Sequence, residues 1–166
     1  MEKVKAEQAL AGANYAAAAS QFLTFTLDTE QYGIEILKVQ EIKGYSAVTP
    51  IPNAPPHIKG VMNLRGTVVP VVDLRNKFSL DSIDYNKFTV IIVVTVGEKV
   101  VGLVVDAVSD VLEIPAADIR PTPDLGVRAD TRFISGMASV GDRLAVLLDI
   151  ERLLHEDELV APGSVN

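Results

Sequence analysis

The sequence predicts a mainly β fold in which an internal duplication forms two small, similar barrels with short helices. Hydrophobic residues make up 48% of the chain and aromatic residues only 5%. The apolar residues are therefore mostly aliphatic and often β-branched, which favours strands. Short apolar runs alternate with turn residues, a pattern typical of small barrels rather than of strand–helix–strand units.

Two blocks of the sequence occur in the same order in both halves. Residues 58–60 (IKG) align with residues 134–136 (ISG), and this offset of 76 holds without a gap as far as Phe78 and Leu154. Upstream, Gly33 aligns with Gly102 at an offset of 69. Matching blocks in a fixed order indicate a duplicated structural unit.

The predicted elements follow the same order in each half. Two strands joined by a turn come first, then a short irregular strand, a proline-marked loop and a strand that ends in Asp73 or Asp149. Each aspartate is suited to cap the helical turn that follows it, and the second of these turns is a C-terminal helix. Pro70 lies within its strand, which predicts an edge position or a bulge there. The three early strands are predicted at residues 22–27, 32–36 and 39–42, and again at 90–96, 100–105 and 108–111.

Two barrels of this size would be only marginally stable alone, so we expect them to pack against each other within residues 21–156. The first barrel is expected to span about residues 21–87 and the second about residues 88–156, and the sequence leaves exchange of strands between them open. Residues 1–20 and 157–166 are expected to be flexible tails.

Charge and composition argue against several classes of partner. The formal net charge is −7 and no basic cluster is present, so nucleic acid and anionic membranes are poor partners. No apolar run is long enough to cross a bilayer, and we expect no membrane insertion. The chain has no cysteine, which removes disulfides and thiolate metal sites and suits the cytoplasm.

No pattern in the sequence requires catalysis. Neither histidine has a cysteine or a second histidine at metal-binding spacing. The sequence also has no phosphate-binding glycine loop and no G-x-S-x-G turn. The carboxylate pairs Asp106 with Asp110 and Asp81 with Asp84 fit solvated or structural roles better than acid–base chemistry. We therefore predict a protein that is not an enzyme and has no catalytic residue, metal or cofactor.

The two halves differ at one turn. Arg65 of the first half aligns with Gly141 of the second, so the arginine has no counterpart. On a structural interpretation Arg65 ties down a loop by bonding backbone carbonyls. On a docking interpretation it presents a planar, five-donor guanidinium to a partner. The residues alone leave both open.

Three stretches carry a resemblance to a known family: YGIEILKVQEIKGY, TPIPNAPPHIKGVMNLRGTVVPVVDLR and VGLVVDAVSDVLEI. The chain resembles the CheW family of bacterial chemotaxis coupling proteins from about Gln21 to Leu154. The resemblance implies two packed SH3-like barrels and a non-enzymatic adaptor in the cytoplasm. Such an adaptor joins the regulatory domain of the histidine kinase CheA to the cytoplasmic hairpin of chemoreceptors and is recruited to receptor arrays at the membrane. We expect a monomer when the protein is alone.

The resemblance also implies which residues meet each partner. The receptor hairpin is expected in a groove between the barrels, with an apolar floor and charged rim, which suits an amphipathic helix. The receptor-facing residues implied are Val39, Glu41, Ile42, Arg65 and Val108, and the kinase-facing residues are Tyr45, Ser46 and Val48.

Two alternatives stay open on the residues alone. The receptor-facing valines could be ordinary core between the barrels, and Glu41 a solvated strand residue. The chain could also be a small-ligand-binding β-barrel, which detectable ligand protection in a thermal melt would favour.

Overall fold

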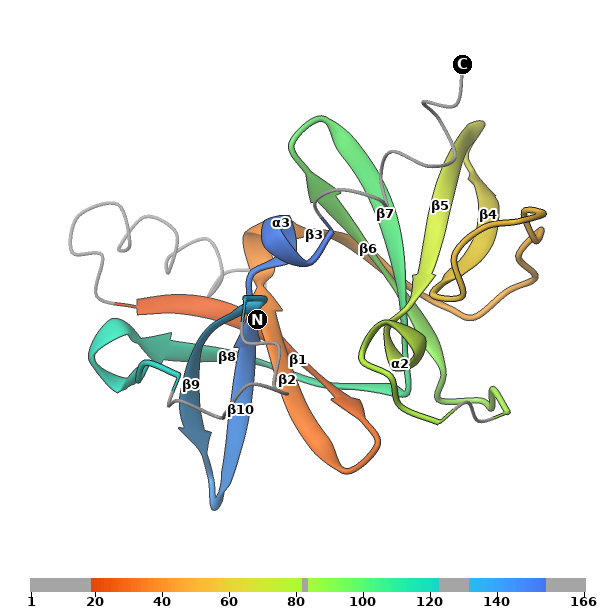
Figure 1. Cartoon of the computed structure of the whole chain (residues 1–166). Coiled ribbons are helices and arrows are strands. Elements are labelled where there is room, and N and C mark those ends of the chain that lie inside the picture. The colour runs from red at the N-terminus through yellow and green to blue at the C-terminus, as the bar shows by residue number, and fades with distance from the viewer. Residues whose placement is uncertain (1–18, 82–83, 123–131, 155–166) are drawn as a thin grey trace.

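A computed structural model of the chain describes residues 19–81, 84–122 and 132–154. Within these ranges the fold is mostly β and consists of two five-stranded sheets with a few short helices (Figure 1). The predicted fold class is therefore confirmed. The predicted flexible tails lie almost entirely outside the described residues.

Each sheet contains strands from both halves of the sequence. Sheet 1 has the order β8-β1-β2-β10-β9, with β1 (Ala19–Leu27), β2 (Glu30–Glu35), β8 (Ala107–Pro115), β9 (Ile134–Val140) and β10 (Arg143–Leu148). Sheet 2 has the order β3-β6-β7-β5-β4, with β3 (Val39–Gly44), β4 (Ile58–Leu64), β5 (Thr67–Asp73), β6 (Val90–Val96) and β7 (Lys99–Val105). The helices are α2 (Leu74–Lys77) and α3 (Ile150–Leu153), with 3-10 turns η1 (Ile36–Lys38) and η2 (Ala116–Asp118).

The two sheets are equivalent under interchange of the sequence halves. Replacing each strand of sheet 1 by its counterpart in the other half gives the strand order of sheet 2. The parallel pairs agree as well: β2 pairs with β10 and β7 with β5, so Leu147 lies opposite Gly33 as Val71 lies opposite Gly102. The ranges 21–87 and 88–156 therefore do not delimit the two sheets. The exchange arises because the chain crosses to the other sheet after β2 and again after β7.

Two details differ from the predicted elements. Each half has five strands rather than the four expected, because a further strand, β4 or β9, forms a hairpin with the strand that ends in aspartate. Pro70 is not on an edge strand, since β5 lies between β7 and β4, and the nearby bulge is at Ile58 to Gly60. Pro70 is tolerated because the ladder with β7 begins one residue later, at Val71.

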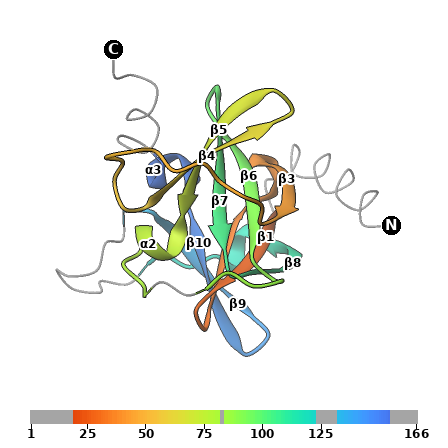
Figure 2. The ribbon, with the colours of Figure 1, turned by 90° about the vertical axis from the view of Figure 1, so that its right-hand side faces the viewer.

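One apolar cluster joins the two sheets. It combines Phe25 of β1 with Leu103 of β7 and both short helices, through Leu74 of α2 and Leu153 of α3, and all four side chains are fully buried. Burial of this kind across two small sheets makes them one folding unit. The β4–β5 hairpin and the β9–β10 hairpin extend from opposite ends of the molecule (Figures 1 and 2).

Candidate partner-docking surface

Arg65 occupies a tight turn that fixes where its side chain can go. Arg65 and Gly66 are the two loop residues of the β4–β5 hairpin, with φ angles of 50° and 89°. Two positive φ angles are what a two-residue hairpin turn requires, although side chains other than glycine rarely adopt them. Asn63 Oδ1 accepts a hydrogen bond from the Gly66 backbone N–H at 2.8 Å and completes the turn. The arginine is thus presented at the tip of a hairpin.

The Arg65 side chain forms an ion pair with Glu41 of β3. Because β3 and β4 are the two edge strands of sheet 2, this contact requires the sheet to curl until its edges meet. The hydrogen bond lowers the pKa of Glu41 below its ordinary value and raises that of Arg65. The predicted pair of rim charges is therefore brought together. The structural interpretation expects Arg65 to bond backbone carbonyls. Among the described residues, however, the only hydrogen-bond partner of Arg65 is the side chain of Glu41.

The apolar residues predicted to face a receptor differ in exposure. Ile42 of β3 is 42% exposed, which is high for a large apolar side chain. Val39 of β3 and Val108 of β8 are half-buried and pack against the cluster between the sheets. These two valines occupy equivalent places in the halves, one on each sheet. Each valine contacts the core on one side and is partly exposed on the other. The core interpretation and the receptor-facing interpretation therefore each describe part of their environment.

The residues predicted to face the kinase lie in the loop that follows β3, beside sheet 2. The Tyr45 ring packs on the Tyr85 ring with centroids 4.3 Å apart, and the Tyr45 backbone N–H donates to Thr89 O at 3.1 Å. Val48 packs against the core of sheet 2, whereas Ser46 is exposed. The segment is held in place by its partly buried members and presents Ser46 outward.

Tyr85 was not predicted from the sequence, yet it anchors this segment. Its hydroxyl donates to Asp73 Oδ2, and Lys59 Nζ lies 4.9 Å from the centre of its ring. Burial above all, and then the hydrogen bond to Asp73, raise the pKa of Tyr85 well above its usual range. The other oxygen of Asp73 accepts from the Arg75 backbone N–H at 2.9 Å and caps α2, as predicted.

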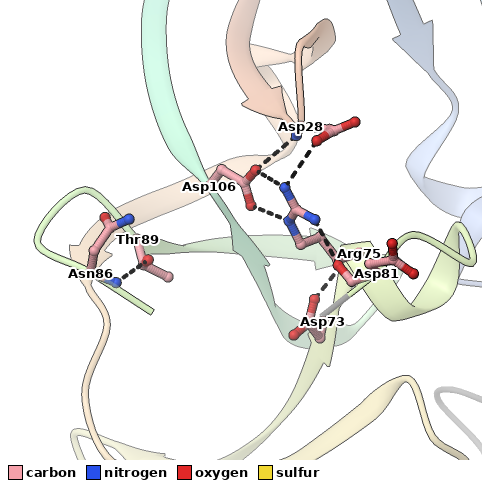
Figure 3. Close-up of polar contacts among 7 residues, drawn as sticks. All are labelled: Asp28, Asp73, Arg75, Asp81, Asn86, Thr89 and Asp106. Atoms are coloured by element: carbon pink, nitrogen blue, oxygen red, sulfur yellow. Dashed lines mark hydrogen bonds and ion pairs between the residues drawn. The ribbon is translucent and has the colours of Figure 1, made fainter. Parts of the chain in front are cut away.

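Arg75 is the centre of a second polar network (Figure 3). Its guanidinium makes two hydrogen bonds of 2.9 Å to the carboxylate of Asp106, and it also donates to Asp81 O at 2.6 Å and to Asp28 Oδ1 at 3.4 Å. The side chain is only 8% exposed. The hydrogen bonds to Asp106 are the largest cause of the raised pKa of Arg75. Asp106 thus has a structural role, and its sequence neighbour in the suspected pair, Asp110, lies exposed on β8.

A signal for Arg75 was present in the sequence. At the offset of 76 that aligns Arg65 with Gly141, Arg75 aligns with Glu151, a reversal of charge. The charge reversal does not by itself identify the partner of Arg75. That partner, Asp106, is known only from the topology, because it is the single residue between β7 and β8, where the chain passes from one sheet to the other.

Neither a metal site nor a membrane-spanning helix is present in the part of the chain that the structure describes. No three histidine, aspartate or glutamate side chains gather as a metal site there. No helix among those residues is long and apolar enough to pass through a membrane.

The comparisons with known proteins agree on one family. The model of the CheW-like domain matches residues 21–158. A chemotaxis protein CheW of Klebsiella aerogenes is 50% identical over 145 residues, which cover 87% of each chain. A chemotaxis protein CheW of Rhizobium meliloti is 35% identical over 138 residues, covering 83% of this chain and 89% of that one.

A solved structure shows the same fold. The scaffolding protein TtCheW from Thermoanaerobacter tengcongensis matches with a TM-score of 0.77 and 32% identity. The match covers 85% of this chain and 92% of the other. The exchanged strand order is therefore not an isolated arrangement, because the superposition extends over both sheets.

Proposed function

The chain belongs to the family of CheW-like domains, and from that membership we propose that it couples a chemoreceptor to the histidine kinase CheA through two separate surfaces. It is a chemotaxis adaptor of the scaffolding kind, similar to the relatives named above. It works without catalysis, in the cytoplasm and within receptor arrays, and is a monomer when alone. The comparisons give no support to the small-ligand-binding β-barrel.

The exposed guanidinium of Arg65 is the observation that carries this proposal. The side chain is 65% exposed and uses one of its nitrogens on Glu41, which leaves its other donors facing outward. Arginine is enriched where protein partners bind because its fork of donors fixes the geometry of contact. The left-handed backbone of Arg65 belongs to the two-residue turn that Asn63 completes, and this turn holds the side chain at the exposed tip of the hairpin.

The receptor surface uses both sheets. Val39, Glu41 and Ile42 lie on β3 of sheet 2, and Val108 lies on β8 of sheet 1. Arg65 lies in the β4–β5 turn at the other edge of sheet 2. An amphipathic helical hairpin of the receptor packs its apolar face on the aliphatic side chains, and the charges at the rim set its register. The kinase surface is the segment from Tyr45 to Val48, which follows β3 and packs against sheet 2. The two partners therefore bind at the same time without competing for one patch.

The test is a pair of isothermal titrations, against the regulatory domain of a matching kinase and against a soluble cytoplasmic fragment of a receptor. Saturable one-to-one binding of both partners supports the proposal. Arg65→Ala should weaken receptor binding about tenfold, the effect expected of a binding hot spot. Arg143→Ala is the matched control, because Arg143 is an exposed arginine beside the equivalent turn of sheet 1. Absence of binding to both partners would refute the function.

A further inference from the structure

The two sheets are connected by two short crossovers. The first is η1, which leads from β2 of sheet 1 to β3 of sheet 2, and the second is Asp106, which leads from β7 of sheet 2 to β8 of sheet 1. Each crossover carries one partner of an ion pair to a short helix. Asp106 pairs with Arg75 of α2, and Lys38 of η1 pairs with Glu151 of α3. Arg75 and Glu151 occupy equivalent positions in the duplication and carry opposite charges, whereas Lys38 lies one residue after Leu37, the counterpart of Asp106.

The two pairs differ in burial and in number of contacts. Arg75 is 8% exposed and Asp106 is 19% exposed, and their contact is bidentate. Lys38 and Glu151 are 33% and 56% exposed and share a single hydrogen bond of 2.7 Å. Bidentate arginine–carboxylate contacts are directional, and a largely buried one is little screened by solvent, whereas exposed lysine pairs contribute little. The ion pair at Asp106 therefore holds its crossover more firmly than the Lys38–Glu151 pair holds η1.

Arg75 also reaches the turn between β1 and β2. It donates to Asp28 Oδ1, and the Asp28 backbone N–H donates to Asp106 Oδ2 at 2.7 Å. The Asp106 backbone N–H in turn donates to Thr26 O at 3.1 Å. The guanidinium of Arg75 on α2, which directly follows β5 of sheet 2, thus binds both the β1–β2 turn and the residue that leads into β8 of sheet 1, as Figure 3 shows for Arg75, Asp28 and Asp106.

The proposed receptor surface depends on the spacing of the same two sheets. Val108 follows Asp106 by two residues on β8, whereas Glu41 and Arg65 belong to sheet 2. A rotation of β8 relative to sheet 2 changes the distance between Val108 and the charged pair. The proposed kinase surface, in contrast, packs against sheet 2 and does not depend on the relative orientation of the two sheets.

We propose that Arg75 is a positioning residue for receptor binding: by holding Asp106 and Asp28 it fixes the orientation of sheet 1 on sheet 2, and so the spacing of the two sides of the receptor surface. The expected effect of Arg75 on receptor binding rests on the proposed function. When only a fraction of the molecules has the competent orientation, the apparent association constant equals the intrinsic one multiplied by that fraction. Partner binding at a single sheet is unaffected.

The first readout does not need a partner. The chain has no cysteine, so Val68→Cys on sheet 2 and Leu144→Cys on sheet 1 give two labelled sites, 65% and 55% exposed in the unchanged protein. Electron spin resonance then gives the distribution of distances between spin labels on these sites. We expect a narrow distribution that broadens in Arg75→Lys and in Asp106→Asn. Glu151→Gln, at the equivalent position in the other half, is the control and should leave the distribution narrow.

The second readout is binding. Arg75→Lys should weaken binding of the receptor fragment about fivefold, as expected if only a fifth of the molecules keep the competent orientation, and change binding of the kinase regulatory domain by less than about twofold. Asp28→Asn removes the charge of the most exposed carboxylate in the network but keeps an oxygen that can accept a hydrogen bond, so it is a milder variant that keeps the fold. An unchanged distance distribution, or an equal loss of affinity for both partners, would overturn the positioning role. If the unchanged protein binds neither partner, the proposed function fails, and the distance distribution still decides whether Arg75 fixes the sheets.

Discussion

Arg65 and Glu41 join the two edge strands of sheet 2 by an ion pair across the mouth of the curled sheet. The pair is on the surface, where the Arg65 side chain is 65% exposed and the Glu41 side chain 29% exposed. Solvent screens such pairs, so its contribution to folding is small. The arrangement serves better to hold the guanidinium in one direction than to hold the sheet together.

Reversing the two charges separates these roles. Arg65→Glu alone places two carboxylates together and should lower the melting midpoint by about 2 °C, and adding Glu41→Arg should restore it. Receptor affinity should stay about tenfold low in the double variant, because the partner then meets a carboxylate at the hairpin tip. Thermal melts and titrations of the single and double variants measure both effects. Recovery of receptor binding in the double variant would show that the ion pair, not the arginine, is what the receptor needs.

Ser46 gives the corresponding test for the kinase surface. It is exposed between two partly buried neighbours, Tyr45 and Val48, so a larger side chain there meets solvent rather than the core. Ser46→Arg should weaken binding of the kinase regulatory domain about tenfold through a steric and charge mismatch, and leave receptor binding unchanged. Ser139→Arg, an exposed serine on β9 of the other sheet, is the control. Equal loss of both partners in Ser46→Arg would mean that the two surfaces are not separate.

The duplication was predictable from the sequence, but the exchange of strands was not. Gly33 lies opposite Leu147 of the other half. Pairing within its own half would place Val71 there, and Val71 is the aligned counterpart of Leu147. Since both arrangements satisfy the same pattern of glycine and aliphatic residues, only the crossovers decide between them.

The candidate site likewise combines contacts that the sequence predicts with contacts that it does not. Glu41 and Arg65 are expected as opposite charges at the rim of the receptor groove, and the structure pairs them. The roles of Tyr85 and Arg75 were missed because their partners, Asp73 and Asp106, come close only after the sheets are assembled. Local patterns predict strands, turns and caps, whereas contacts that join separate elements require the topology.

Gly102 of β7 tests how closely this strand packs against its neighbours in sheet 2, above all against Ile91 of β6. A Cβ at this position would lie 2.9 Å from Ile91 Cγ2 and 3.6 Å from Val71 Cγ2 in the buried interior of sheet 2. Gly102→Ala should therefore reduce the free energy of unfolding by about 1–3 kcal/mol, as overpacked cores do. Urea unfolding measures it. Gly44→Ala is the control, because nothing lies within 4 Å of its Cβ, and a loss as small as the control's would contradict the close approach.

Tyr85 makes stability depend on alkaline pH. The Tyr85 hydroxyl donates a hydrogen bond to the carboxylate of Asp73, a residue that is only 6% exposed, so Tyr85→Phe should cost about 1–2 kcal/mol at pH 7. Burial raises the pKa of Tyr85 above its ordinary 10.0, so the folded protein holds this proton more firmly than the unfolded chain. The stabilisation is complete below pH 10. It declines above pH 10, as the unfolded chain releases a proton that the folded protein keeps, by at most about 1.4 kcal/mol per pH unit.

The difference in stability between the unchanged protein and Tyr85→Phe should therefore be constant from pH 7 to 9 and narrow above pH 10. Urea unfolding at several pH values gives this difference, and absorbance of tyrosinate in the folded protein should show one fewer late-titrating tyrosine in Tyr85→Phe. Tyr32→Phe is the comparison, since burial raises the pKa of Tyr32 as well, with Glu30 and Asp28 as its neighbouring charges instead of Asp73. A difference for Tyr85→Phe that stays constant or widens above pH 10 would show that Tyr85 ionises as readily in the folded protein as in the unfolded chain.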